Sequence, residues 1–185
     1  MDTWIWALIA VAVIVIAVVL WLALTKRRTT ALRGQFGPEY DRTVQQTDSR
    51  REAEADLSAR RERREQLDIR PLTTAAQERY SSQWQQVQSQ FVDQPAVSLG
   101  QAGELVLQVM RERGYPMDDF EQRAADISVD HPEMVEHYRA GQAVSKGAAS
   151  GDATTEDMRQ GLVHYRALFE ELLGTDSGTD RGEVR

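Results

Sequence analysis

The stretch "TTEDMRQGLVHYRALFEELL", from Thr154 to Leu173, gives the clearest structural signal in the chain. Its apolar residues recur at spacings of three and four, which places them on one face of an α-helix. The residues of this face are Met158, Leu162, Tyr165, Phe169 and Leu172. The stretch therefore predicts an amphipathic helix that begins after Thr154 and packs one face against other helices.

Comparable patterns precede this helix, and no strand-like alternation of apolar and polar residues competes with them. We expect helices in residues 73–91, from about Pro95 to Gly114, around Phe120 to Ile127 and from Asp130 onward. Together with the last helix, they predict a compact bundle of about five helices in residues 71–173 and an all-α fold.

Polar residues and turn formers indicate where these helices begin and end. Thr74 and Gln77 are placed as a capping box for the first helix, and Asp130 as an acidic N-cap with Glu133 at the third position. We expect "SKGAASGDAT", residues 145–154, to be a loop. The polar residues 174–185 predict a disordered tail.

Residues 39–66 read "EYDRTVQQTDSRREAEADLSARRERREQ" and contain no proline or glycine. Ala, Glu, Arg and Gln favour a helix, and apolar residues form no sustained heptad, which disfavours a coiled coil. We predict one long charged stalk helix here. Gly34, Gly37 and Pro38 are expected to separate it from the preceding segment.

The arginine-rich end of this stalk, residues 59–66, allows two interpretations. Four closely spaced arginines suit a nucleic-acid or lipid patch, but Glu62 and Glu65 interleave with them. Mixed charge of this kind favours a solvated helix face.

Residues 4–24, "WIWALIAVAVIVIAVVLWLAL", contain no charged or strongly polar residue. A helix of this length spans about 31 Å, which matches the hydrocarbon core of a bilayer. A cleaved signal peptide would need a basic N-terminal region, a shorter apolar core and a cleavage site of small residues. The sequence lacks that arrangement and predicts an uncleaved N-terminal transmembrane helix.

Aromatic and basic residues border this expected span. Tryptophans favour the two membrane–water interfaces, and basic residues remain on the cytoplasmic side. The basic residues also suit anionic lipid headgroups, which is compatible with their role in topology. The predicted membrane-interface residues are Trp4, Trp6, Trp21, Lys26, Arg27, Arg28 and Arg33.

These signals predict a single-pass protein of the bacterial plasma (inner) membrane, with its N-terminus outside and its C-terminal domain cytoplasmic. The bacterial assignment rests on arginine strongly outnumbering lysine. The expected organisation is an anchor in residues 1–25, a basic linker and stalk in 26–70, the acidic bundle in 71–173 and the tail in 174–185.

Charge and composition exclude several classes of function. Residues 26–70 carry 12 basic against 9 acidic residues, whereas residues 71–185 carry 10 against 19, a net charge of −9. Such an acidic domain argues against a nucleic-acid partner. The chain has no cysteine, which excludes disulfides and thiolate chemistry. No glycine-rich phosphate loop and no G-x-S-x-G motif occurs.

The segment "DHPEMVEH", residues 130–137, raises the question of a metal site. Zincin motifs require histidine where this segment has Glu133, and His131 and His137 would point about 120° apart on one helix. Helix capping accounts for the acidic residues, so we expect no metal ligand, no cofactor and no catalytic residue.

The tetrapeptide HYRA occurs twice and contains two of the three histidines. In each copy the tyrosine, Tyr138 or Tyr165, is at the centre of the apolar face. His137 and His164 fall at the border of that face. We predict two tyrosines in one core with histidines at its rim, where a small pocket is the alternative to plain packing.

Six phrases occur in this order: "FGPEYDR", "LDIRPL", "QFVDQP", "VMRERGYP", "DFEQRAADISVDHP" and "HYRALFEELL". With them the chain resembles a family of uncharacterised bacterial single-pass membrane-anchored proteins with a charged stalk and a helical C-terminal domain. The resemblance covers nearly all of residues 30–173. It implies this architecture and no enzymatic activity.

Two hypotheses of function follow. The first is a non-enzymatic interaction or scaffold module, in which a membrane anchor presents the acidic bundle to a protein partner with a basic segment. The second is a small-ligand sensor or enzyme with a pocket between aromatic-bearing helices near His137 and His164.

Overall fold

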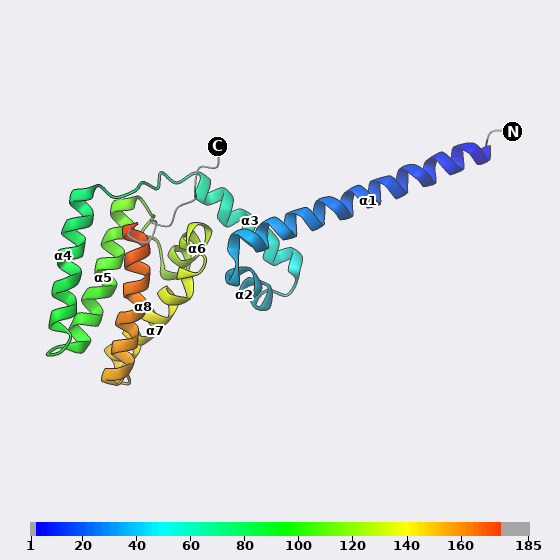
Figure 1. Cartoon of the computed structure of the whole chain (residues 1–185). Helices are drawn as coiled ribbons and strands as arrows, with labels where there is room; N and C mark the ends of the chain where they lie inside the picture. Colours follow the sequence, from blue (N-terminus) through cyan, green and yellow to red (C-terminus); the bar gives the residue numbers. More distant parts are fainter. Residues whose placement is uncertain (1–2, 175–185) are drawn as a thin grey trace, which may run out of the picture. The chain divides into compact units, whose positions relative to one another are not determined.

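The computed structural model describes residues 3–174, except for the side chains of residue 3 and residues 5–11. In this part of the chain it contains eight α-helices and no strand, which confirms the all-α class (Figure 1). The helices form two compact units, Met1–Ser58 and Ala59–Arg185. The boundary between the units lies within helix α3, Arg50–Glu65.

The first unit begins with α1, Thr3–Phe36, and continues with α2, Pro38–Gln46. Helix α1 runs through Gly34, which was expected to interrupt it. The helix ends instead at Gly37, whose φ of +46° suits glycine, and Pro38 then starts α2 in its first turn.

Over the described residues, no helix combines the length and the hydropathy needed to cross a membrane. The side chains of residues 5–11, including that of Trp6, belong to the expected span and lie outside the described residues. The transmembrane helix therefore stays a prediction. Of the predicted tail, residues 174–185, all but Gly174 also lie outside them.

The prediction of one long stalk helix is wrong, because the chain breaks at residues 47–49 into α2 and α3. The Thr47 hydroxyl donates to the Thr43 carbonyl (3.0 Å), and the Ser49 hydroxyl accepts from the backbone N–H of Glu52 (3.2 Å). Short polar side chains of this kind compete with helical hydrogen bonds and cap new helices.

A buried carboxylate connects the three helices of the first unit. Glu54 of α3 accepts hydrogen bonds from the Thr29 hydroxyl of α1 (2.7 Å) and the Tyr40 hydroxyl of α2 (3.0 Å). Burial and this bond to Glu54 raise the pKa of Tyr40, so the tyrosine remains a proton donor. The buried apolar side chains of this unit are Leu32, Phe36, Tyr40, Ala53 and Leu57.

The second unit contains five helices after α3, which confirms the predicted bundle (Figure 1). They are α4 (Thr74–Gln90), α5 (Pro95–Arg113), α6 (Phe120–Asp130), α7 (Met134–Ser150) and α8 (Thr155–Leu173). Helix α5 packs against α4, α7 and α8. In their shared core, Trp84 of α4 stacks on Phe169 of α8 with ring centroids 4.6 Å apart.

Two predicted helix ends are confirmed. Thr154 and Asp157 form a capping box at the start of α8. Helix α5 ends at Gly114, which has a φ of +99°. A Cβ at Gly114 would lie 2.5 Å from the Asp68 carbonyl oxygen, so the connector before α4 passes too close for any side chain.

Three other predicted ends are wrong. Helix α4 is capped by Thr73 rather than Thr74, since the Thr73 side chain accepts from Ala76 N–H. Asp130 is the last residue of α6, and its carboxylate accepts from Tyr115 (3.2 Å) instead of capping α7. Helix α7 continues to Ser150, so the predicted loop shortens to residues 151–154.

The arginine-rich end of α3 is not simply a solvated face. Arg63 contacts Asp126 (3.0 Å), which is buried within α6, and Asp118 (2.5 Å), which precedes that helix. Arg64 pairs with Asp130. These ion pairs place the last turns of α3 in the second unit, on the acidic residues that surround α6.

Candidate functional site

The two HYRA copies lie on neighbouring helices, α7 and α8, and their tyrosines share one core. Tyr138 and Tyr165 are each 2% exposed. Arg123 donates to the Tyr138 hydroxyl (3.0 Å), and the Tyr165 hydroxyl bonds to Ser145 (3.0 Å). The structural part of the prediction, two tyrosines facing one core, is confirmed.

The ring of Tyr165 packs closely against the backbone of two neighbouring helices. A Cβ added at Gly141 of α7 would lie 2.8 Å from the ring, and one at Gly103 of α5 would lie 3.2 Å from it. The two glycines therefore provide the room for the ring. This packing argues for a structural role of the tyrosines.

His137 and His164 meet at the half-buried rim of this core, with their Nδ1 atoms 2.9 Å apart. One nitrogen must donate and the other accept, so at least one ring is neutral. Burial and the neighbouring His137 lower the pKa of His164. The sequence placed both histidines at the rim, but their direct contact depends on the alignment of two helices and could not be read from it.

The pair has the chemistry of metal ligands but lacks further ones. In the described part of the chain, no group of three or more His, Cys, Asp or Glu side chains is arranged to hold a metal. The third histidine, His131, lies elsewhere and contacts Glu171 (2.7 Å). The arrangement therefore suits a hydrogen bond between helices.

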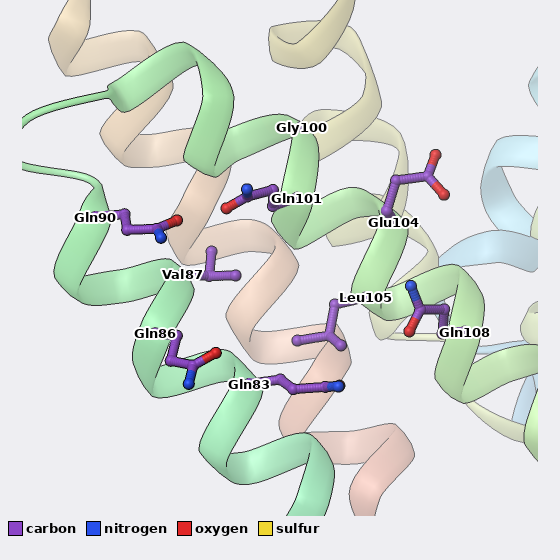
Figure 2. Close-up of a pocket in the computed structure, with 9 residues that line it drawn as sticks. All are labelled: Gln83, Gln86, Val87, Gln90, Gly100, Gln101, Glu104, Leu105 and Gln108. Atoms are coloured by element: carbon purple, nitrogen blue, oxygen red, sulfur yellow. The ribbon is translucent and has the colours of Figure 1, made fainter.

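A groove of about 420 Å³ lies between α4 and α5 (Figure 2). On each helix the lining residues include pairs that lie three, four and seven positions apart, so they share one face of that helix. Five of them are glutamines. The lining residues are Gln83, Gln86, Val87, Gln90, Gly100, Gln101, Glu104, Leu105 and Gln108.

This glutamine-lined groove offers hydrogen bonds rather than reactive groups. Each amide has both donors and an acceptor, and the buried carbonyl oxygen of Gln83 has no hydrogen-bond partner among the described residues. Glu104 is the one ionisable group among the lining residues. Such a surface can both donate hydrogen bonds and accept them. The sequence analysis did not predict this groove, although its glutamines recur at helical spacing beside the apolar faces of the two helices.

A second groove, of about 820 Å³, lies in the first unit between α1 and α3. Its lining includes two predicted interface residues, Trp21 and Arg28, and two arginines assigned to the stalk, Arg50 and Arg51. The sequence analysis did not place Arg50 and Arg51 beside α1, because it did not predict the break at residues 47–49 that returns α3 toward α1.

The predicted membrane-interface residues have different surroundings. Trp4 and Trp21 are 63% and 65% exposed, and Lys26 and Arg27 are also exposed. Arg28 donates to the Ser58 hydroxyl (2.8 Å), and Arg33 pairs with Asp41 (2.7 Å). Of these four basic residues, Arg28 and Arg33 thus make contacts within the first unit, whereas Lys26 and Arg27 extend from its surface.

No protein-family model, no curated protein and no solved structure matches this chain. The resemblance to membrane-anchored helical proteins therefore stays a prediction.

Proposed function

We propose that this chain is a non-enzymatic, membrane-anchored interaction module. Its anchor is the first part of α1, and its binding surface is the glutamine-lined groove of the second unit. The natural location is the bacterial plasma membrane, with the N-terminus outside and the remainder cytoplasmic.

The observation that carries this proposal is the exposure of apolar side chains in α1. Ten large apolar side chains between Val13 and Leu24 are each at least 48% exposed. Because they include runs of consecutive residues, they occur on all sides of the helix. A helix that is apolar all round needs an apolar environment, and a lipid bilayer supplies one.

The change of character along α1 supports the same assignment. Beyond Thr25 the helix carries basic residues, and its apolar side chains Leu32 and Phe36 are at most 1% exposed. The packed part of the unit thus begins where the apolar surface ends, as expected for a helix that leaves a membrane.

The anchor is tested in the full chain by charge insertion. Val15→Asp combined with Val19→Asp should move the protein from carbonate-washed membranes to the supernatant, because carboxylates in the hydrocarbon core are costly. Val92→Asp, at a valine that is 86% exposed on the α4–α5 turn, is the matched control and should remain with the membranes. Equal retention of both variants would contradict an anchor in α1.

Topology needs a separate measurement. Two reporters are fused after Arg185, one that is active only in the cytoplasm and one that is active only outside the cell. The first should be active and the second inactive. Activity restricted to a reporter that works outside the cell would reverse the proposed orientation.

The partner of the groove is proposed to be a basic, polar protein segment. Glu104 in the groove and the net charge of −9 over residues 71–185 support a positively charged partner. The amides of Gln86 and Gln101 can pair with both donors and acceptors of a polypeptide backbone.

Site-specific photocrosslinking in intact cells tests this surface. A crosslinker at Gln101 should give a discrete protein adduct that Glu104→Lys diminishes. The same crosslinker at Arg159, an exposed position on α8, is the control. Identical adducts from both positions would rule out the groove as the binding surface.

A further inference from the structure

The groove between α1 and α3 brings together residues that are far apart in the sequence. Arg50 and Arg51, in the first turn of α3, line it with Trp21, Leu24 and Arg28 of α1. The bonds of Arg28 to Ser58 and of Thr29 to Glu54 hold α3 beside α1. Residues that the sequence places in a distant stalk are therefore adjacent to the basic end of the expected span.

The groove has a positive balance of charge. Three arginines, Arg28, Arg50 and Arg51, line it against one acid, Glu54. One oxygen of Glu54 already accepts two hydrogen bonds and lies 3.9 Å from the Nε of Arg50. Glu54 thus acts as the acceptor that organises this unit, and the arginines retain donors for another anion.

Two of the arginines differ in how firmly they are held. The Nε of Arg50 donates to the Tyr40 hydroxyl (3.2 Å), which orients the guanidinium and leaves its terminal nitrogens for a ligand. Arg51 is exposed and has no ion-pair partner among the described residues. A planar guanidinium is well matched to phosphate oxygens, to which it can donate two parallel hydrogen bonds.

The apolar part of the groove distinguishes a lipid from a soluble anion. Trp21 and Leu24 are each 65% exposed and form the wall toward the apolar half of α1. Trp21 and Arg28 are separated by about 10 Å of helix rise, so the groove extends from the apolar part of α1 into its basic part. An amphipathic ligand could therefore contact Trp21 with its acyl chains and the arginines with its headgroup.

We propose that this groove binds the phosphate headgroup of an anionic membrane lipid. The proposal rests on the membrane anchor proposed above and goes further, because it assigns a defined lipid site that includes Arg50 and Arg51.

The experiment uses the full chain in lipid nanodiscs, followed by native mass spectrometry of retained lipid. Discs of phosphatidylcholine alone are compared with discs that contain a minor fraction of phosphatidylglycerol. The wild type should retain one phosphatidylglycerol molecule and no phosphatidylcholine. Inorganic phosphate, added to detergent-solubilised chain, provides the soluble-anion arm and should not bind at concentrations that saturate the lipid site.

Arg51→Gln is the first variant, because it removes charge without removing a contact within the unit. It should lower phosphatidylglycerol retention about 5-fold, and Arg50→Gln with Arg51→Gln about 25-fold, since each basic residue contributes about 1 kcal/mol near an anionic surface. Lys26→Gln with Arg27→Gln is the comparison for diffuse charge. It removes two charges that do not line the groove, so it should lower retention of the single phosphatidylglycerol molecule less than Arg50→Gln with Arg51→Gln does.

Each alternative outcome has a distinct meaning. An equal loss in the Arg50/Arg51 and Lys26/Arg27 variants would show attraction by diffuse charge and would overturn the site. Binding of inorganic phosphate that Arg51→Gln abolishes would overturn the lipid assignment. A wild type that enters no nanodisc would contradict the anchor, whereas one that enters all discs without retaining phosphatidylglycerol would contradict the groove alone.

Discussion

The two compact units are centred on different kinds of side chain. In residues 1–58 the centre is a carboxylate, Glu54, which accepts hydrogen bonds from two other helices. In residues 59–185 it is an aromatic ring, Tyr165, which lies against two glycines. The first unit buries five apolar side chains among its described residues, whereas the core of the second contains 21.

This difference shows that the number of buried apolar side chains determines which interactions select the arrangement of the helices. Five buried apolar side chains define few unique contacts, so directional hydrogen bonds must select the arrangement of α1, α2 and α3. A core of 21 residues can select its arrangement by shape alone. The first unit should therefore be sensitive to loss of a polar group, and the second to changes of volume.

The largest effect is expected from Phe169→Ala in the second unit. This change removes a ring that is 2% exposed and stacked on Trp84, and it should lower the free energy of unfolding by about 4 kcal/mol. Val163→Ala on the same helix, at a side chain that is 46% exposed, should cost less than about 0.5 kcal/mol. Urea denaturation measures both, and similar losses would mean that α8 does not pack as described.

The corresponding change in the first unit is Glu54→Ala. It leaves the hydroxyls of Thr29 and Tyr40 without their acceptor and should cost about 2–3 kcal/mol. Hydrogen exchange should then accelerate in residues 29–58 and remain unchanged in α5. Glu52→Ala, at an exposed position of the same helix, is the control. Unchanged exchange in residues 29–58 would remove the proposed contrast between the units.

A pair of glycines tests the role of volume more finely. In Gly141→Ala the new Cβ would lie 2.8 Å from the Tyr165 ring, so the ring must shift, at a cost of about 2 kcal/mol. Gly100→Ala adds a Cβ in open space within α5 and should stabilise the chain by about 0.5–1 kcal/mol. Melting temperatures should therefore move in opposite directions, and a decrease in both would contradict this account.

The smallest expected effect is a change in how the stability of the folded chain depends on pH. The pKa of His164 is lowered in the folded chain, so the unfolded chain binds more protons as the pH falls through about 6.5. The contribution of neutral His164 is fully present above that pH and is lost progressively below it. His164→Gln should flatten the dependence of stability on pH below about 6.5. If the stability of this variant depends on pH as strongly as that of the wild type, groups other than His164 cause the dependence.

The sequence predicts regular helices well and contacts between them poorly. The five helices of the bundle follow from apolar residues at helical spacing, and Thr154 and Gly114 mark two ends correctly, because these signals are local. The break at Thr47–Ser49 is also local. It was missed because a long run without glycine or proline outweighed the Ser49 cap of α3.

Other features depend on three-dimensional alignment. The contact between His137 and His164 requires a specific register of α7 against α8, which no single helix pattern determines. The ion pair of Arg63 with Asp126 joins residues 63 positions apart, so the local alternation of charge in α3 gave no indication of it. The two grooves combine side chains that are unremarkable within their own helices.

The close approach of Asp68 to Gly114 has a practical consequence for anyone who expresses the bundle separately. Arg70 N–H donates to the Arg113 carbonyl (2.8 Å), and Arg63 and Arg64 contact acidic residues around α6. A fragment that starts at Pro71 would remove all these contacts and expose the C-terminal end of α5. One that starts at Ala59 keeps them, and so the natural place to cut the chain lies inside a helix.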